Sequence, residues 1–250
     1  MNKKVNFIFI ICLFLIVLTG CSRDKKYSIE DKVTEEIKYI ENILINIVNN
    51  FATGNYEVRN TNLNDESNEG KENDIENLAI EIGTYNTESI LEDTRKIEEA
   101  SNRIMVDLAI ENIDNEDITK FSDGINKMLI NISKEDEREY LVELNNVFAL
   151  LPNFEAKISN NVNDIFERRI KYFTISSFIS FSVGDKELAK SQVEKLENEY
   201  LEKQKVVEYV EEHKYNLNKI YLLIQELKKA IETDSEALVK EKYLLLIDEI

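Results

Sequence analysis

The stretch ISSFISFS, residues 175–182, is apolar except for four serines, whose side chains are small. A helix needs a polar face only where it meets water, so a helix that is apolar nearly all round is surrounded by other helices. Apolar residues at helical spacing lead into this stretch through Ile165, Ile170 and Phe173. We therefore expect residues 175–182 to belong to the central helix of the domain.

Helix boundary signals flank this stretch and recur towards the C-terminus. Gly184 is expected to end the central helix, and Asp185 to act as the N-cap of the next one. The segment EEHKYN, residues 211–216, reads as a break between helices. Residues 233–236, Thr-Asp-Ser-Glu, are predicted to cap a last helix whose apolar positions are Leu238, Leu245 and Ile250. Packing of its end, residues 242–250, against its own bundle is a simpler expectation than association with another chain.

Towards the N-terminus, a stripe of apolar residues at three- and four-residue steps predicts another amphipathic helix. Its members are Val33, Ile37, Ile40, Leu44, Ile47 and Phe51. Ser28 and Asp31 resemble a capping box at its start. A second capping signature at residues 133–136 opens a helix that is expected to stop near Pro152. Further helices are predicted around residues 75–82, 90–111 and 118–129.

Turn residues are scarce throughout the chain. After residue 20 it holds one proline, Pro152, and five glycines, and strand-rich proteins need many more. The predicted fold class is all-α, an irregular bundle of about seven to nine helices in a single domain over residues 29–250. Within it, residues 54–73 are polar and lack periodicity, which indicates a long exposed loop. A flexible insertion is the simpler interpretation of this loop, and a recognition loop is the alternative.

The N-terminus has the pattern of a secretory signal peptide. Lys3 and Lys4 precede residues 7–18, a run of twelve residues without a polar side chain, and small residues follow. Since a transmembrane helix needs ~20 apolar residues, this run is too short for a comfortable span. We expect residues 1–20 to be removed.

The residues at the end of that run, Leu18-Thr19-Gly20-Cys21, look like the lipobox of bacterial lipoproteins. Cys21 would then carry a diacylglycerol and become the new N-terminus, with a third acyl chain, such as palmitate, on its amine. Two or three acyl chains anchor a protein firmly to a membrane. Residues 21–28 would form the lipidated cysteine and a tether. The alternative is a secreted protein in which Cys21 is free or disulfide-bonded.

Charge and cysteine content exclude several classes of function. The net charge is −18, and loss of Lys3 and Lys4 lowers it to −20, so the protein should repel nucleic acid and anionic lipid surfaces. The only other cysteine, Cys12, lies in the signal peptide. The domain therefore has no disulfide, and packing alone must stabilise it.

Side chains suited to catalysis or metal binding are few. His213 is the only histidine and lies beside two glutamates, so we interpret it as a solvated surface residue. No two glycines are close enough for a phosphate-binding loop, and residues 114–124 lack the ligand spacing of a calcium loop. Carboxylate pairs are common in so acidic a chain and more often form solvated faces. The prediction is a non-enzyme with no catalytic residue, metal or cofactor.

Two clusters in the second half admit a binding interpretation. Arg168 and Arg169 could bind an acidic partner surface, but at helical spacing they more often pair with Glu167 or Asp164. An aromatic run is predicted to be core rather than a ligand cage, and it comprises Phe166, Tyr172, Phe173, Phe178 and Phe181.

The chain resembles a known family in its lipobox, its polar tether, its richness in Lys, Asn, Ile and Glu, and the stretch ERRIKYFTISSFISFSVGDKELAKSQVEKL, residues 167–196. These features are similar to the all-helical outer-surface lipoproteins of Borrelia-type spirochaetes, a paralogous family that includes a complement regulator-acquiring surface protein. The resemblance implies a helical domain on the cell surface, with some paralogs binding complement proteins. It carries over no binding residue.

These features favour a surface-displayed lipoprotein in the outer membrane, acting as a non-enzymatic module that binds complement or another host serum protein. The alternative is a lipoprotein that faces the periplasm and has a structural or assembly role in the envelope. The tether sequence SRDKKYS, residues 22–28, does not distinguish the two membrane leaflets.

Overall fold

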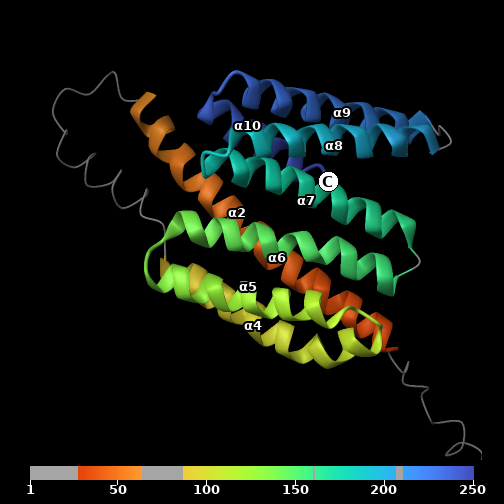
Figure 1. Ribbon diagram of the computed structural model, residues 1–250. Helices are drawn as coiled ribbons and strands as arrows, with labels where there is room; N and C mark the ends of the chain where they lie inside the picture. Colours follow the sequence, from red (N-terminus) through yellow and green to blue (C-terminus); the bar gives the residue numbers. More distant parts are fainter. Residues whose placement is uncertain (1–27, 64–86, 160, 207–210) are drawn as a thin grey trace, which may run out of the picture.

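The computed structural model describes residues 28–63, 87–159, 161–206 and 211–250 (Figure 1). Within these ranges the chain forms eight α-helices and no strand, which confirms the predicted all-α fold. The helices are α2 (Ile29–Leu63), α4 (Thr87–Ile110), α5 (Asn115–Ser133), α6 (Glu137–Ile158), α7 (Val162–Ser182), α8 (Lys186–Val206), α9 (Glu211–Glu232) and α10 (Glu236–Ile247). The signal peptide, Cys21, most of the tether and the predicted helix at 75–82 lie outside the described residues.

The helices from α4 to α9 follow one another side by side, and α2 runs diagonally across α4, α6 and α7 (Figure 1). Helix α10 returns to pack against α7 and α9 and also meets α2, so the C-terminal segment does pack on its own bundle. Every core residue of the described part lies between Val33 and Leu246. We therefore expect a chain that starts at Lys25 to fold, because it keeps every core residue of the described part.

Helix α7 is central, as the serine-rich stretch predicts. It packs against α6, α8, α10 and α2. Residues 174–181 are all buried, including Ser176, Ser177 and Ser180. The small serine side chains allow neighbouring helices to approach closely. The hydroxyl of Ser177 donates a hydrogen bond to the carbonyl oxygen of Thr174 at 2.8 Å, within the same helix.

Three of the predicted helix boundaries are confirmed. Gly184 has a φ of 86°, a left-handed conformation that glycine adopts without steric cost. Asp185 then accepts a hydrogen bond from the N–H of Leu188 at 3.0 Å and caps α8. Ser28 and Asp31 exchange two backbone-to-side-chain hydrogen bonds, at 3.0 and 3.1 Å, so they form a complete capping box.

The helix that was expected to stop near Pro152 continues through it to Ile158. Proline removes one backbone donor from a helix, but the residues around Pro152 are buried against neighbouring helices, and this packing holds the helix together. Ser159 is the C-cap of α6, and Asn161 is the N-cap of α7. The side chain of Asn161 accepts a hydrogen bond from the N–H of Asn163 at 3.1 Å and caps α7.

Two predicted interruptions are partly or wholly wrong for a common reason. Helix α2 continues to Leu63, so residues 54–63 of the predicted polar loop are helical, and residues 64–73 lie outside the described part. Helix α9 begins at Glu211, so the break expected at 211–216 is helical as well. Once a helix has formed, each added residue costs little, and neither segment contains a proline.

The buried face of α10 also differs from the prediction. Leu238 and Leu245 are 43% and 46% exposed, whereas Val239, Tyr243 and Leu246 have no exposed surface. The helix is apolar over most of its circumference, so its own pattern does not select a face. Packing against α7 and α2 determines which face of α10 is buried.

Candidate functional site

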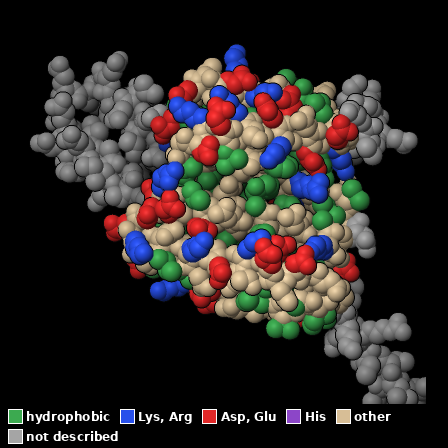
Figure 2. All heavy atoms as spheres, viewed as in Figure 1, with side chains coloured by type: hydrophobic (Ala, Val, Ile, Leu, Met, Phe, Trp, Pro, Cys, Tyr) green, Lys and Arg blue, Asp and Glu red, His purple; other side chains and the backbone are tan. Residues whose placement is uncertain are grey.

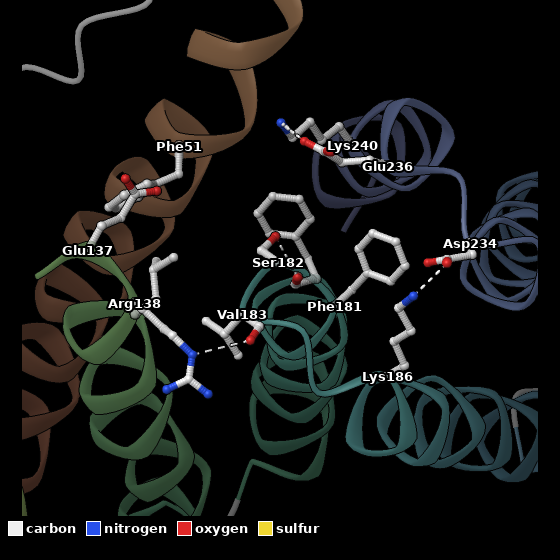
Figure 3. A pocket seen from close by; sticks show the side chains of 12 residues that line it. Phe51, Glu137, Arg138, Phe181, Ser182, Val183, Lys186, Asp234, Glu236 and Lys240 are labelled. Atoms are coloured by element: carbon white, nitrogen blue, oxygen red, sulfur yellow. Dashed lines mark hydrogen bonds and ion pairs between the residues drawn. The ribbon is translucent and has the colours of Figure 1, made fainter.

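A cavity of about 560 Å³ opens at the end of the bundle where the first turns of α6, α8 and α10 meet the last turn of α7 and one side of α2 (Figure 3). Its size lies in the range of small-ligand sites. The cavity has an apolar floor and a charged rim. The floor includes Phe51, Leu141, Phe178 and Phe181, and the rim carries Glu137, Arg138, Lys186, Asp234, Glu236 and Lys240.

The aromatic floor is fixed by packing. Phe178 stacks on Tyr243 of α10, with ring centroids 4.3 Å apart and an interplanar angle of 17°. Phe181 lies near the end of α7, just before the left-handed turn at Gly184. Phe51, Phe178 and Phe181 are all buried. The floor therefore consists of well-packed aromatic rings.

Two ion pairs neutralise most of the rim. Lys186 Nζ lies 2.5 Å from Asp234 Oδ2. Lys240, which is 5% exposed, donates to Glu236 Oε1 at 2.7 Å. This contact compensates in part for the hydration that the buried Lys240 ammonium group has lost.

The remaining basic residue, Arg138, is engaged outside the cavity and at its edge. Its Nη1 lies 2.9 Å from Glu139 Oε1, and its Nε donates to the carbonyl oxygen of Val183 at 3.4 Å. This second contact joins the start of α6 to the end of α7.

Glu137 is the exception on the rim, because its carboxylate has no hydrogen bond or ion pair within the described part of the chain. In Figure 3 its side chain lies beside Phe51 on the wall formed by α6 and α2. Partial burial raises the pKa of the Glu137 carboxyl, and the positive charge of Lys240 opposes that rise. The cavity thus contains one carboxylate that has no direct hydrogen bond or ion pair with the described residues.

No protein family, curated protein or solved structure matches this chain. Its function must therefore be inferred from its own residues.

A second polar site joins α2, α6 and α7 and lines a cavity of about 280 Å³. Arg168 is 6% exposed and pairs through Nη1 with Glu41, while its Nη2 lies 3.5 Å from Glu155 Oε2. Glu41 and Glu155 are 3% and 0% exposed. Lys171 Nζ lies 3.8 Å from Glu41 Oε1. One guanidinium group therefore serves two buried carboxylates from different helices.

Burial raises the pKa of the Glu41 and Glu155 carboxyls, and the charge of Arg168 opposes the rise in both. Neither oxygen of Glu155 accepts a hydrogen bond from the described residues. The site holds three helices together, but at a cost in desolvation that its contacts offset only in part.

The prediction that Arg168 and Arg169 pair with Glu167 or Asp164 is wrong. Arg168 points inward to Glu41 and Glu155, and Arg169 Nη1 lies 3.1 Å from Glu199 Oε1 on α8. Consecutive residues on a helix point in directions about 100° apart, so the two arginines meet different neighbours. Because Arg168 is buried, it is also not accessible to the surface of an acidic partner protein.

The aromatic run is core, as predicted. Phe178 and Phe181 are buried, and Phe166, Tyr172 and Phe173 are partly buried against the core. The side chain of His213 lies outside the described part. In the ranges that the structure describes, no group of three or more His, Cys, Asp or Glu residues could hold a metal ion, and no helix is long and apolar enough to cross a membrane.

The cavity at the end of the bundle was not predicted from the sequence. Its lining residues are spread from Phe51 to Lys240, and each one looks like an ordinary core or surface residue of its own helix. Residues 133–136 predicted a helix start just before Glu137, but no local signal shows that three helix starts meet. Only the packing of the helices brings them together.

The raised pKa of Glu155 predicts a pH-dependent effect for Glu155→Gln. A carboxyl whose pKa is raised above its ordinary value of 4.5 stabilises the fold fully below that value, and this stabilisation is lost as the pH rises through the folded-state pKa. Glutamine does not titrate. We therefore expect the free energy of unfolding of Glu155→Gln, relative to the original protein, to increase between pH 4.5 and pH 7.5 in urea denaturation followed by circular dichroism.

The exposed Glu187→Gln on α8 controls for the loss of one surface charge and should show a smaller change between the two pH values. An equal or opposite trend for Glu155→Gln would contradict the interpretation of Glu155 as a desolvated carboxyl.

Proposed function

We propose that the protein is a bacterial lipoprotein, anchored through acyl chains on Cys21 in the outer membrane and displayed on the cell surface, where its helical domain binds a host protein without catalysis. The observation that carries this proposal is the lipobox Leu18-Thr19-Gly20-Cys21 at the end of the apolar run at 7–18. Serum proteins, complement components among them, are the class of ligand that the family resemblance suggests.

The described surface supports a role in binding. Acidic and basic side chains are interspersed over the face shown in Figure 2. Ion pairs on the described surface include Arg103 with Glu36 and Lys127 with Glu143. Such a surface favours solubility of a domain held outside a membrane. The cavity between α6, α7 and α10 offers a place where a partner side chain can insert, and interfaces gain most of their affinity from a few inserted side chains.

Replacement of Cys21 by serine tests the anchor. The original protein, expressed in a lipoprotein-processing bacterium, should partition into the detergent phase on Triton X-114 separation, and Cys21→Ser should move to the aqueous phase, because it lacks the acyl thioether. Mass spectrometry of the N-terminal peptide gives the same answer directly. An unmodified sulfur at position 21 would contradict lipidation.

Protease treatment of intact cells tests display and separates the two membrane orientations. A surface protein should be degraded together with other surface proteins, whereas protection from the protease would favour the periplasm-facing role. Capture from host serum with the chain from Lys25 onward then tests the binding role. Specific retention of a serum protein is expected, and retention of none would contradict a host-binding module.

A further inference from the structure

The charge pattern of the cavity at the end of the bundle indicates what it can bind. Six charged residues line it, and five of them have an ion-pair partner in the described structure. Glu137 is the sixth. Glu137 is an exposed residue, but its side chain reaches the cavity wall beside Phe51, where desolvation raises the pKa of its carboxyl, and no residue of the described part forms an ion pair with it.

A positively charged ligand group would supply the counter-ion that Glu137 lacks. A carboxylate in a partly desolvated site attracts an ammonium or guanidinium group more strongly than it does in water, because the local dielectric is lower. The phenylalanine rings of the floor suit an apolar body attached to such a group. The strongly negative net charge of the chain also attracts positively charged ligands at long range.

An anionic ligand fits the cavity less well. The three basic residues of the rim, Lys186, Lys240 and Arg138, already have ion-pair partners, and a ligand carboxylate would have to compete with one of these partners. It would also come close to Glu137. A cation needs no such rearrangement, because it meets a carboxylate without a partner.

We propose that this cavity binds a protonated amine or guanidinium group carried on an apolar body, with Glu137 as its counter-ion and Phe51 and Phe181 as the apolar floor. A Lys or Arg side chain of a protein ligand, flanked by apolar residues, is the source of this group that follows from the proposed host-binding function. A free organic amine has the same chemistry. The amine and the protein ligand should differ in their affinity for the cavity.

The test uses the chain from Lys25 and the probe 4-phenylbutylammonium, followed by isothermal titration calorimetry and by chemical-shift changes in NMR spectra. We expect saturable binding in the millimolar range, with shifts at residues around Glu137 and Phe181. The uncharged analogue 4-phenylbutanol should bind at least tenfold more weakly, and so should the probe to Glu137→Gln. Glu187 lies in the exposed first turn of α8, outside the cavity, so the control variant Glu187→Gln should bind the probe as strongly as the original protein does.

The outcomes separate this inference from the proposed function. Equal binding of 4-phenylbutanol and 4-phenylbutylammonium, no loss of binding in Glu137→Gln, or no saturable binding at all would overturn the inference, whether or not a serum protein is captured. Probe binding without any captured serum protein would support the cavity and contradict the host-binding function. If a serum protein is captured, 4-phenylbutylammonium should compete with that protein for binding. The Glu137→Gln variant should bind the serum protein at least tenfold more weakly than the original protein does.

Discussion

Replacement of Arg168 by alanine is expected to lower the free energy of unfolding by about 3–5 kcal/mol, because it leaves two buried carboxylates without their shared counter-ion. Glu41 and Glu155 are almost completely buried, and Arg168 is the basic residue that contacts both. The loss is a large fraction of the about 5–15 kcal/mol that stabilises a typical domain. Urea denaturation of the chain from Lys25, followed by circular dichroism at neutral pH, measures it.

The neighbouring arginine provides the matched control. Arg169 is 44% exposed in its side chain and pairs with Glu199 on α8, so Arg169→Ala should cost no more than about 1 kcal/mol. The triple replacement of Arg168, Glu41 and Glu155 by methionine should recover most of the stability, because it removes the uncompensated charges together. Equal losses in the two arginine variants would show that the buried cluster has no special role.

Tyr243→Ala is expected to lower the free energy of unfolding by about 3–5 kcal/mol, as for other large aromatic residues that leave a cavity. Tyr243 has no exposed surface, stacks on Phe178 of α7, and donates its hydroxyl proton to Asn49 Oδ1 of α2 at 2.8 Å. It therefore joins the last helix to the central helix and to the first described one. Thermal and urea denaturation of the chain from Lys25 measure the loss.

Tyr243→Phe separates the hydroxyl from the ring and should cost about 1 kcal/mol, the usual net value of one hydrogen bond. Tyr39→Ala, at a tyrosine that is 43% exposed, should cost about 0.5 kcal/mol or less. Because Phe178 lines the cavity at the end of the bundle, Tyr243→Ala should also weaken binding of 4-phenylbutylammonium. Unchanged stability of Tyr243→Ala would show that α10 contributes little to the fold.

Local signals predicted helix boundaries well where a side chain or a glycine closes hydrogen bonds within a few residues. The capping box of Ser28 with Asp31, the turn at Gly184 and the cap at Asp185 are of this kind. Local signals failed at Pro152 and at residues 211–216, where helix continues. At Pro152, burial against other helices outweighs the lost hydrogen bond, and a sequence pattern does not show that burial.

The amino-acid sequence by itself determined that this chain is helical and which helix lies at the centre, because the period of apolar residues and the narrow polar face of residues 175–182 are properties of single helices. The tertiary structure alone decided that Arg168 faces Glu41 and Glu155, that Tyr243 rather than Leu245 is buried, and that Glu137 stands unpaired beside an aromatic floor. These arrangements depend on how the faces of different helices meet. Contacts between different helices, such as Arg168 with Glu41 and Tyr243 with Asn49, leave no periodic trace in either segment.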